Sequence, residues 1–139
     1  TLFPYTTLFR SGKIYFLETS SRVGGAHIAE MVAEASNINL WKEWAAIEDS
    51  LVKQTKYTLP KIKKEYAGIV LTLSKFQHPD LSSFLDPEVC YRVPLDYHAG
   101  LIVKSDKQER VLELLNTYTD RFVNDFTAIV AQNKVSNLH

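Results

Sequence analysis

Cysteine is almost absent from this 139-residue chain, which contains Cys90 alone and therefore forms no internal disulfide. That single thiol fits a reducing compartment, and we expect a cytoplasmic location. An excess of charge is absent too, because 16 basic side chains balance 16 acidic ones. This balance argues against the basic surface that nucleic acids and acidic lipids attract, so we expect no nucleic-acid partner. No apolar run approaches the roughly 20 residues of a membrane-spanning helix, so we expect no membrane partner.

The composition is that of an ordinary globular protein, with 45% apolar and 12% aromatic residues. A chain of this size buries roughly two-thirds of the surface that its unfolded form exposes. It can therefore build a core as one domain without a disulfide or a structural metal.

The first eleven residues, TLFPYTTLFRS, match one translated reading frame of a widely used sequencing adapter residue for residue. They also lack the basic stretch followed by an apolar stretch that marks a secretory signal. We expect residues 1–11 to be a non-native segment and residues 12–139 to be the C-terminal portion of a longer protein. The alternative is a natural edge strand rich in threonine and phenylalanine.

The first native stretch, residues 12–54, reads as a strand followed by two helices. The β-branched and aromatic run at 13–18 predicts the strand, and the serine- and glycine-rich residues 19–25 predict a turn. Apolar residues then recur at helical spacing, with Asn37 or Asn39 as a stop or a cap between the helices. The second helix has a stripe formed by Leu40, Trp44, Ile47 and Leu51. We expect both helices to cover one side of a sheet and their apolar stripes to lie in the core.

The middle of the chain changes character at Lys53, after which residues 53–65 contain five lysines and Pro60. This composition predicts a linker or solvated loop, with a nucleotide-phosphate or nucleic-acid patch as the alternative. Strands are predicted at 66–76, 88–94 and 97–105, with a loop or one short helical turn over 77–87. Gly100, inside the last strand, indicates a bulge or a close backbone approach.

A long helix is predicted after the last strand, with Ser105 as its N-cap. Its apolar stripe is Val111, Leu115, Tyr118, Phe122, Phe126 and Ile129. The element order predicts an α+β fold in which a mainly antiparallel sheet packs against helices and a long C-terminal helix ends the chain. We expect residues 12–54 to carry a metal and phosphate site and residues 66–131 to form a C-terminal α+β subdomain.

The segment from Phe16 to Ile28 contains the best candidate site. Glu18 ends the strand, Arg22 follows four residues later, and Gly24 and Gly25 precede a helix. A carboxylate suits a hard divalent cation, and an arginine binds phosphate or carboxylate with two hydrogen bonds. Amides at a helix N-terminus add donors for an oxyanion. The structural alternative is a Glu18–Arg22 ion pair beside a glycine-dependent turn.

Other candidate constellations are weaker. His27, His78 and His98 lack the spacing of zinc ligands. Cys90 lies in a predicted strand, where a buried, inert thiol is more common than a nucleophile.

The run Glu18-Thr19-Ser20-Ser21-Arg22, followed by Val23-Gly24-Gly25-Ala26-His27-Ile28, resembles the ATP-grasp ligases. A late strand of that family carries Glu-x-Asn-x-Arg, and its amino-acid ligase branch continues with Gly-Gly and a helix. Residues 98–103 and 121–126 are also similar to the C-terminal region of the family's carboxylate–amine ligases. The resemblance covers about residues 12–130 and is sharpest around Glu18.

The resemblance implies a role for each matching residue on the phosphate side. Glu18 matches the carboxylate that binds the magnesium ions bridging the ATP phosphates, so ATP and Mg²⁺ are the implied cofactors. Ser20 stands where the family has an asparagine that gives a second metal oxygen, which leaves the number of metal ions open. Arg22 matches the arginine that faces the transferred phosphate or the acyl phosphate, and is the implied catalytic residue.

The resemblance also implies substrate contacts. Gly24 and Gly25 match positions where the backbone approaches the carboxylate substrate, beside Arg22. His27 follows them and is a further candidate for substrate contact, although a histidine at a helix start is more often a surface or packing residue.

The implied activity is ATP-dependent ligation of a small-molecule carboxylate to an amine, of amino-acid type, through an acyl phosphate. The fragment is expected to be inactive alone, because the family's ATP-contacting lysines and strands precede Glu18, and a homo-oligomer formed through the parent protein stays open. Biotin-dependent carboxylases share the Glu-to-Arg pattern but match the Gly-Gly continuation less well. The alternative outside the enzymes is a non-enzymatic α+β module that binds a ligand or pairs with another subunit.

Overall fold

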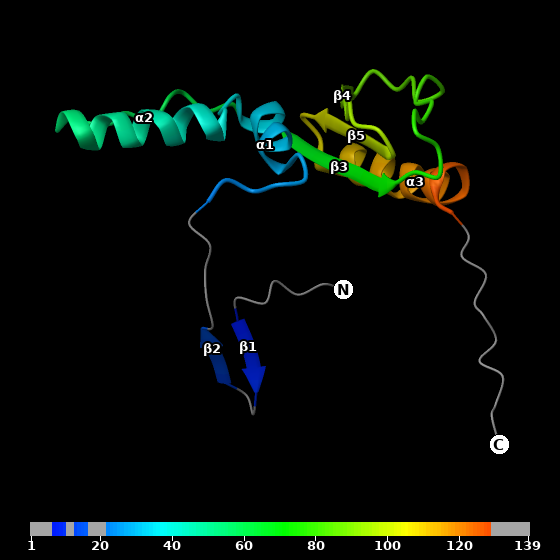
Figure 1. The fold of residues 1–139 in the computed structure, drawn as a ribbon, viewed down its shortest axis with the longest axis horizontal. Coiled ribbons are helices and arrows are strands. Elements are labelled where there is room, and N and C mark those ends of the chain that lie inside the picture. The colour runs from blue at the N-terminus through cyan, green and yellow to red at the C-terminus, as the bar shows by residue number, and fades with distance from the viewer. Residues whose placement is uncertain (1–6, 11–12, 17–21, 129–139) are drawn as a thin grey trace.

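The fold is α+β, as the sequence predicts (Figure 1). A computed structural model describes the backbone of residues 7–10 and 13–16, and residues 22–128 in full. Its elements are β1 (Thr7–Arg10), β2 (Lys13–Phe16), α1 (Ile28–Ser36), α2 (Leu40–Lys53), β3 (Tyr66–Leu73), β4 (Val89–Arg92), β5 (His98–Ser105) and α3 (Gln108–Phe126). None of the helices within these residues is long and apolar enough to cross a membrane.

Two antiparallel sheets account for the described strands. β3, β5 and β4 form a three-stranded sheet in that spatial order, with β5 in the centre. The mainly antiparallel sheet is therefore confirmed, although β3 ends at Leu73 rather than Phe76. β1 and β2 pair with each other in a separate two-stranded sheet. The predicted strand at 13–18 is confirmed over 13–16, and the rest of it lies outside the described residues.

Gly100 shows why β5 needs a residue without a side chain. A Cβ atom at this position would lie 2.5 Å from Cγ2 of Val93 and 2.7 Å from Cδ1 of Leu71. The atoms nearest to this position are side chains of both flanking segments, whereas the sequence predicted a close approach of backbone. The irregularity in pairing lies elsewhere, between Val89 and Tyr91 of β4.

α3 covers one face of the three-stranded sheet and supplies half of the buried core cluster. Alternate residues of β5, Ala99, Leu101 and Val103, join the buried face of α3. The buried residues of α3 are Val111, Leu114, Tyr118, Phe122 and Phe126. The predicted stripe is confirmed at Val111, Tyr118, Phe122 and Phe126, Ile129 lies outside the described residues, and the structure differs at the second position. There Leu114 is the buried residue, and Leu115 packs only partly against the core.

An aromatic cluster lies in this core against the C-terminal half of α3. Phe84, which is fully buried, lies 4.9 Å from the ring of Tyr118 and 5.1 Å from that of Phe122, both edge to face. Such pairs add stabilisation beyond the area that they bury. Phe84 comes from the 77–87 loop, so the loop is held onto the helix by its own side chain.

The start of α3 differs from the prediction. The helix begins at Gln108 with Lys107 as its N-cap, and no side chain caps it. Ser105 is still the last residue of β5, and its hydroxyl accepts a hydrogen bond from the backbone N–H of Lys107 at 3.2 Å. A serine two residues before the cap stabilises the turn into the helix instead of the helix itself.

α1 contacts the sheet at β3 and β5. Lys104 lies on the β5 face opposite α3, and its ammonium group is 2.6 Å from the Glu34 carboxylate of α1. Asn37 ends α1 in the left-handed conformation, and the side chain of Asn39 accepts a hydrogen bond from Lys42 N to cap α2. The predicted stop and cap between the helices are both present.

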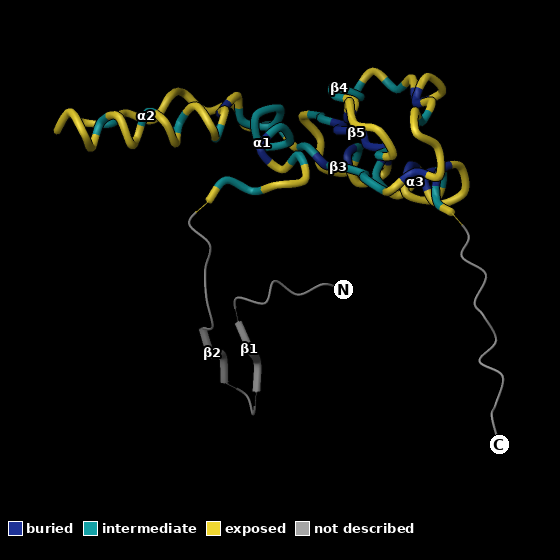
Figure 2. The backbone as a smooth tube through the Cα atoms, in the orientation of Figure 1, coloured by how far each residue is buried: buried dark blue, intermediate teal, exposed yellow. Residues whose placement is uncertain are grey.

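The prediction that α2 lies in the core is wrong. None of its fourteen residues is buried, and Trp41, Trp44 and Leu51 are 51%, 42% and 68% exposed. Figures 1 and 2 show α2 extending from α1 away from the sheet, with little of its length covered. Helical spacing indicates which residues share a face, but it does not say what covers that face.

Residues 55–65 return from the end of α2 to the sheet without regular structure, as predicted for a loop. The segment is fixed near its end by two backbone hydrogen bonds, from Lys63 N to Ser36 O and from Glu65 N to Ala35 O. Most of it is exposed, and the lysines are spread along it.

Candidate functional site

The predicted site is described only in its second half. Its two expected metal ligands, Glu18 and Ser20, lie outside the described residues. The structure describes the other four candidates, Arg22, Gly24, Gly25 and His27. Within the described ranges, no group of three His, Cys, Asp or Glu side chains could hold a metal ion.

A tight turn leads from Arg22 into α1. Its left-handed residues are Ala26 and His27, with φ of 52° and 62°, and not the two glycines. Such a conformation costs a residue with a Cβ about 1–2 kcal/mol. The turn is closed by a hydrogen bond from Ile28 N to Gly25 O at 3.1 Å. Gly24 is packed closely, since a Cβ there would lie 3.1 Å from Cγ2 of Ile28, whereas Gly25 has open space.

His27 packs between α1 and the sheet. Its side chain is 16% exposed, and its ring centroid lies 5.8 Å from that of Tyr91 in β4. Nδ1 is buried without a hydrogen-bond partner in the described part of the chain, 3.7 Å from the Glu30 carboxylate. This placement favours the packing role that the sequence left open beside substrate contact.

A groove brings part of the predicted site together with α2. It has a volume of about 350 Å³, and we call it the Arg22 groove. Its lining residues are Arg22, Val23, Gly24, Leu40, Glu43, Trp44 and Ile47. Of the predicted residues it therefore contains Arg22 and Gly24, whereas Gly25 and His27 do not line it.

On the α2 side of the Arg22 groove, hydrogen bonds hold two side chains in place, Glu43 and Trp44. One Glu43 oxygen accepts a hydrogen bond from the Tyr57 hydroxyl at 2.7 Å, and this bond raises the pKa of Tyr57 above its ordinary value. The Trp44 indole donates to Glu48, one turn further along α2, at 3.3 Å. Trp41, although its ring centroid is 5.9 Å from that of Trp44, lines a different and smaller groove.

Sequence reasoning missed the α2 residues of this site because it assigned them to the core. The signal was present: Leu40, Trp44 and Ile47 are spaced by four and three residues and therefore share a face. Glu43 lies beside that face on the same helix. What the sequence did not supply is the path of the 22–27 turn, which places Arg22 against this face.

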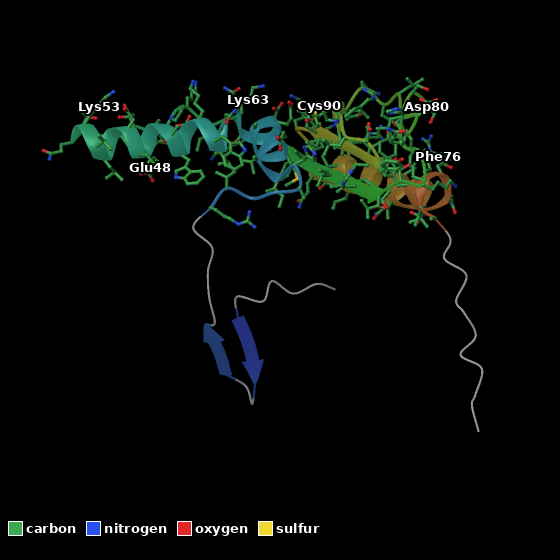
Figure 3. The ribbon with its side chains drawn as sticks, in the orientation of Figure 1. Glu48, Lys53, Lys63, Phe76, Asp80 and Cys90 are labelled. Carbon is green, nitrogen blue, oxygen red and sulfur yellow. The ribbon has the colours of Figure 1, made fainter. Side chains whose placement is uncertain are left out.

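The sequence predicts a buried, inert thiol at Cys90, and the structure makes this residue half-buried. Figure 3 places it at the sheet, apart from Glu48 and Lys53 on α2. Its side chain is half-buried, with Sγ 3.4 Å from the carbonyl oxygen of Ile102. Burial raises the pKa of the Cys90 thiol to about 11, so the thiolate that would act as a nucleophile is scarce at neutral pH.

Comparisons of the chain with protein-family models, with curated proteins and with solved structures found no match. The ATP-grasp relationship therefore stays a prediction based on the residues from Glu18 to Ile28. The function has to be argued from the Arg22 groove and the chemistry of its lining.

Proposed function

We propose that this chain is the C-terminal part of an ATP-grasp carboxylate–amine ligase of amino-acid type, located in the cytoplasm. The observation that carries the proposal is the Arg22 groove. In it Arg22 and Gly24, both of which the resemblance assigns to the anionic substrate, line one cavity of a size that suits a small molecule. The open side of Arg22, which is exposed, leaves its donors accessible to a carboxylate or phosphate.

The proposed reaction has two steps. The γ-phosphoryl group of ATP passes to a carboxylate oxygen, giving an acyl phosphate and ADP. An amine nitrogen then attacks the acyl carbon, the bond to the phosphate oxygen breaks, and an amide, inorganic phosphate and a proton result. Negative charge develops at the transferred group in the first step, and the Arg22 guanidinium stabilises that charge by donating hydrogen bonds.

Glu18, with Ser20, would hold the magnesium. Carboxylate and hydroxyl oxygens are ligands that this hard cation accepts, and bound Mg²⁺ neutralises charge on the phosphates. The nucleotide-contacting residues that the resemblance places before Glu18 complete the site in this proposal, so we expect the 139-residue chain to be inactive alone.

Phosphate release tests the proposal. A complete parent protein, supplied with ATP, Mg²⁺ and a mixture of amino acids, should release phosphate, and Glu18→Ala and Arg22→Ala should abolish most of this activity. Glu109→Ala, which removes an exposed carboxylate from the first turn of α3, is the matched control and should retain it. Robust turnover by the 139-residue chain itself would contradict the requirement for preceding residues.

The exposed apolar face of α2 favours a second candidate, a non-enzymatic module that pairs with another subunit. The two functions differ in nucleotide binding. Titration calorimetry of the complete parent with ATP, in the presence and absence of Mg²⁺, separates them. Magnesium-dependent ATP binding supports the ligase, and its absence supports the module.

A further inference from the structure

The two edges of the three-stranded sheet differ in how they are protected against pairing with another strand. β4, at one edge, has four residues, and its pairing is irregular between Val89 and Tyr91. β3, at the other edge, has eight residues and pairs with β5 without a shift (Figure 1). Its sequence, YAGIVLTL, contains no charged residue and no proline. Short, irregular or charged edges resist strand addition, so β3 lacks the features that protect an edge.

The hydrogen bonds of β5 show which backbone groups of β3 face the open edge. Lys104 N donates to Glu88 O, and Gly100 O accepts from Val93 N, so the even-numbered residues of β5 serve the β4 side. Alternate residues of a strand direct their N–H and C=O groups to opposite sides, so in the observed register the even-numbered residues of β3 bond to β5. The residues whose backbone groups face the open edge are Ala67, Ile69, Leu71 and Leu73.

This open stretch is bounded at both ends. Before it, Glu65 N donates to Ala35 O of α1 at 3.1 Å, and after it, Lys75 N donates to Phe126 O of α3 at 2.8 Å. Between them, none of the four outward N–H groups donates a hydrogen bond within the part of the chain that the structure describes. We call residues 67–73 the free edge, which is about 23 Å long and has donors and acceptors for one further strand.

Two exposed apolar side chains of α3 lie on the same side of the molecule as the free edge. Leu115 marks this flank of the helix, because a Cβ at Gly68 of β3 would lie 2.6 Å from its Cδ1 atom. Leu112 and Val123, three residues before and eight residues after Leu115, lie further round the helix in the same direction. They are 51% and 56% exposed. The free edge is therefore accompanied by apolar surface on the helix above it.

The free edge and these two side chains share one centre. Val70 is the middle residue of the free edge, and the contacts of α3 at its two ends place Val70 level with the middle of the helix, near Tyr118. Leu112 lies six residues before Tyr118, and Val123 lies five residues after it. A two-fold axis through Val70, perpendicular to the sheet, would thus pair the free edge with itself and bring Leu112 against Val123 of a second copy.

We propose that two copies of this chain pair antiparallel through the free edges of β3 and form a continuous six-stranded sheet. Ala67 exchanges hydrogen bonds with Leu73 of the second copy, and Ile69 does so with Leu71 of the second copy. Every outward N–H group of the free edge then has an acceptor. The interface is small, so the dimer is in reversible equilibrium with the monomer.

Two observations select a second copy over an unrelated strand. A second copy brings Leu112 and Val123 of the two α3 helices together, which removes apolar surface from water on both partners. The charged residues that flank the free edge, Glu65 and Lys75, have opposite signs, so antiparallel pairing with a second copy places unlike charges side by side. The dimer uses no residue of the Arg22 groove and does not depend on the proposed function.

Mass and hydrogen exchange test the proposal on the 139-residue protein. Sedimentation equilibrium should show a monomer–dimer equilibrium. As the concentration rises, exchange at the N–H groups of Ile69 and Leu71 should slow at least about tenfold, whereas that of Val70, which bonds to β5, should change much less. A protein that is monomeric up to about 1 mM, or a dimer without slowed exchange at Ile69 and Leu71, would overturn the proposal.

A nuclear Overhauser effect between the Hα atoms of Gly68 and Thr72 tests the register. Within one strand these residues are about 13 Å apart, which is too far for the effect. In the proposed register Gly68 lies opposite Thr72 of the second copy, with the Cα atoms about 4.5 Å apart. A mixture of labelled and unlabelled protein should show this contact between copies. A dimer without it uses another register or another surface and refutes the proposal.

Variants assign the interface to residues. Val123→Lys should weaken dimerisation about tenfold or more, because it places a charge against apolar surface. Val52→Lys, at an exposed valine of α2, is the matched control and should leave dimerisation unchanged. Ala67→Pro removes one outward N–H group from each copy, keeps the bonds to β5 and should also weaken dimerisation about tenfold.

Val123 is exposed, so Val123→Lys decides the test even if Ala67→Pro does not fold, and the urea midpoint of each variant checks folding. If Val52→Lys dissociates the dimer and Val123→Lys does not, the copies pair through α2 and the proposed interface is wrong.

Discussion

The region built on α3 and the arm built on α2 have apolar stripes of the same helical period, but only one of them is buried. Tyr118 and Phe122 of α3 are almost fully buried, whereas Trp44 and Leu51 of α2 are exposed. α3 lies along a three-stranded sheet that supplies the other half of its core, and α2 extends beyond that sheet. The pattern therefore identifies a face, and the tertiary partner decides whether that face stabilises the fold or is left to contact something else.

The largest expected effect contrasts one buried ring with one exposed side chain. Phe84→Ala should lower the free energy of unfolding by about 3–5 kcal/mol, because it removes the centre of the aromatic cluster and leaves a cavity. Leu51→Ala in α2 should change it by less than about 0.5 kcal/mol. Urea unfolding monitored by circular dichroism measures both. Equal losses would mean that α2 shares the core after all.

The sheet and α3 were predictable because local pattern and burial agree there. β5 is central, so its continuous apolar run from Ala99 to Val103 is buried on both faces, and the α3 stripe has a sheet to pack against. Leu114 was missed because it lies next to the predicted stripe. With 3.6 residues per turn, a spacing of three or of four residues keeps a side chain on the same face, so the pattern alone did not choose between Leu114 and Leu115.

Only the part of the candidate site that is contiguous in the sequence could be predicted. Glu18 to Gly25 could be singled out as a contiguous motif, but the placement of Arg22 in one groove with Glu43 and Trp44 depends on the left-handed turn at Ala26 and His27. These are residues with side chains, which sequence rules do not assign to that conformation. The partner residues of Arg22 are thus a consequence of backbone geometry that the sequence pattern does not encode.

The second prediction compares a glycine of the sheet with a glycine of the turn before α1. Gly100→Ala should destabilise the protein by about 1–3 kcal/mol, because its Cβ would lie 2.5 Å from Val93 and force β4 or β5 to shift. Gly25→Ala, in the turn before α1, meets no atom within 4 Å and should be nearly neutral. Urea midpoints of the two variants measure the difference. A costly Gly25→Ala would show that the turn is as tightly constrained as the sheet.

A polar network ties the 77–88 region to α3 and makes the core pH-sensitive. The hydroxyl of Tyr118 donates to Asp86, and Arg110 donates to Asp86 at 2.8 Å and to Glu88 at 2.9 Å. The Tyr118 hydrogen bond, with help from Arg110, lowers the pKa of Asp86, and the Arg110 hydrogen bond lowers that of Glu88. Burial, and then the bond to Asp86, raises the pKa of Tyr118 to about 12.

The third prediction follows from the signs of these shifts. Carboxyl groups with a lowered folded-state pKa stabilise the fold above their ordinary values of 3.8 and 4.5, and this stability is lost as the pH falls below them. The contribution of Tyr118 is complete below its ordinary value of 10 and is lost as the pH rises toward about 12. Asp86→Asn should cost about 1 kcal/mol at pH 7 and flatten the acid decline.

Urea unfolding from pH 2 to pH 7 measures that decline, with Asp49→Asn, in the exposed Asp49–Lys53 pair of α2, as the control. The control should follow the wild-type curve within about 0.5 kcal/mol, because exposed ion pairs contribute little. If the free energy of unfolding of Asp86→Asn falls with pH in parallel to that of the wild type, Asp86 does not cause the acid sensitivity.

The smallest effect tests whether the arm is stabilised separately from the core. The Tyr57–Glu43 hydrogen bond links the returning segment to the first turn of α2. Because the bond contributes nothing to the core around α3, Tyr57→Phe should leave the global free energy of unfolding within about 0.5 kcal/mol of wild type. Amide hydrogen exchange in α2 should nevertheless become about three- to tenfold faster, since a local hydrogen bond affects local opening. If exchange accelerates equally in α3, the two regions unfold as one cooperative unit, and the exposed face of α2 cannot be treated as an independent arm.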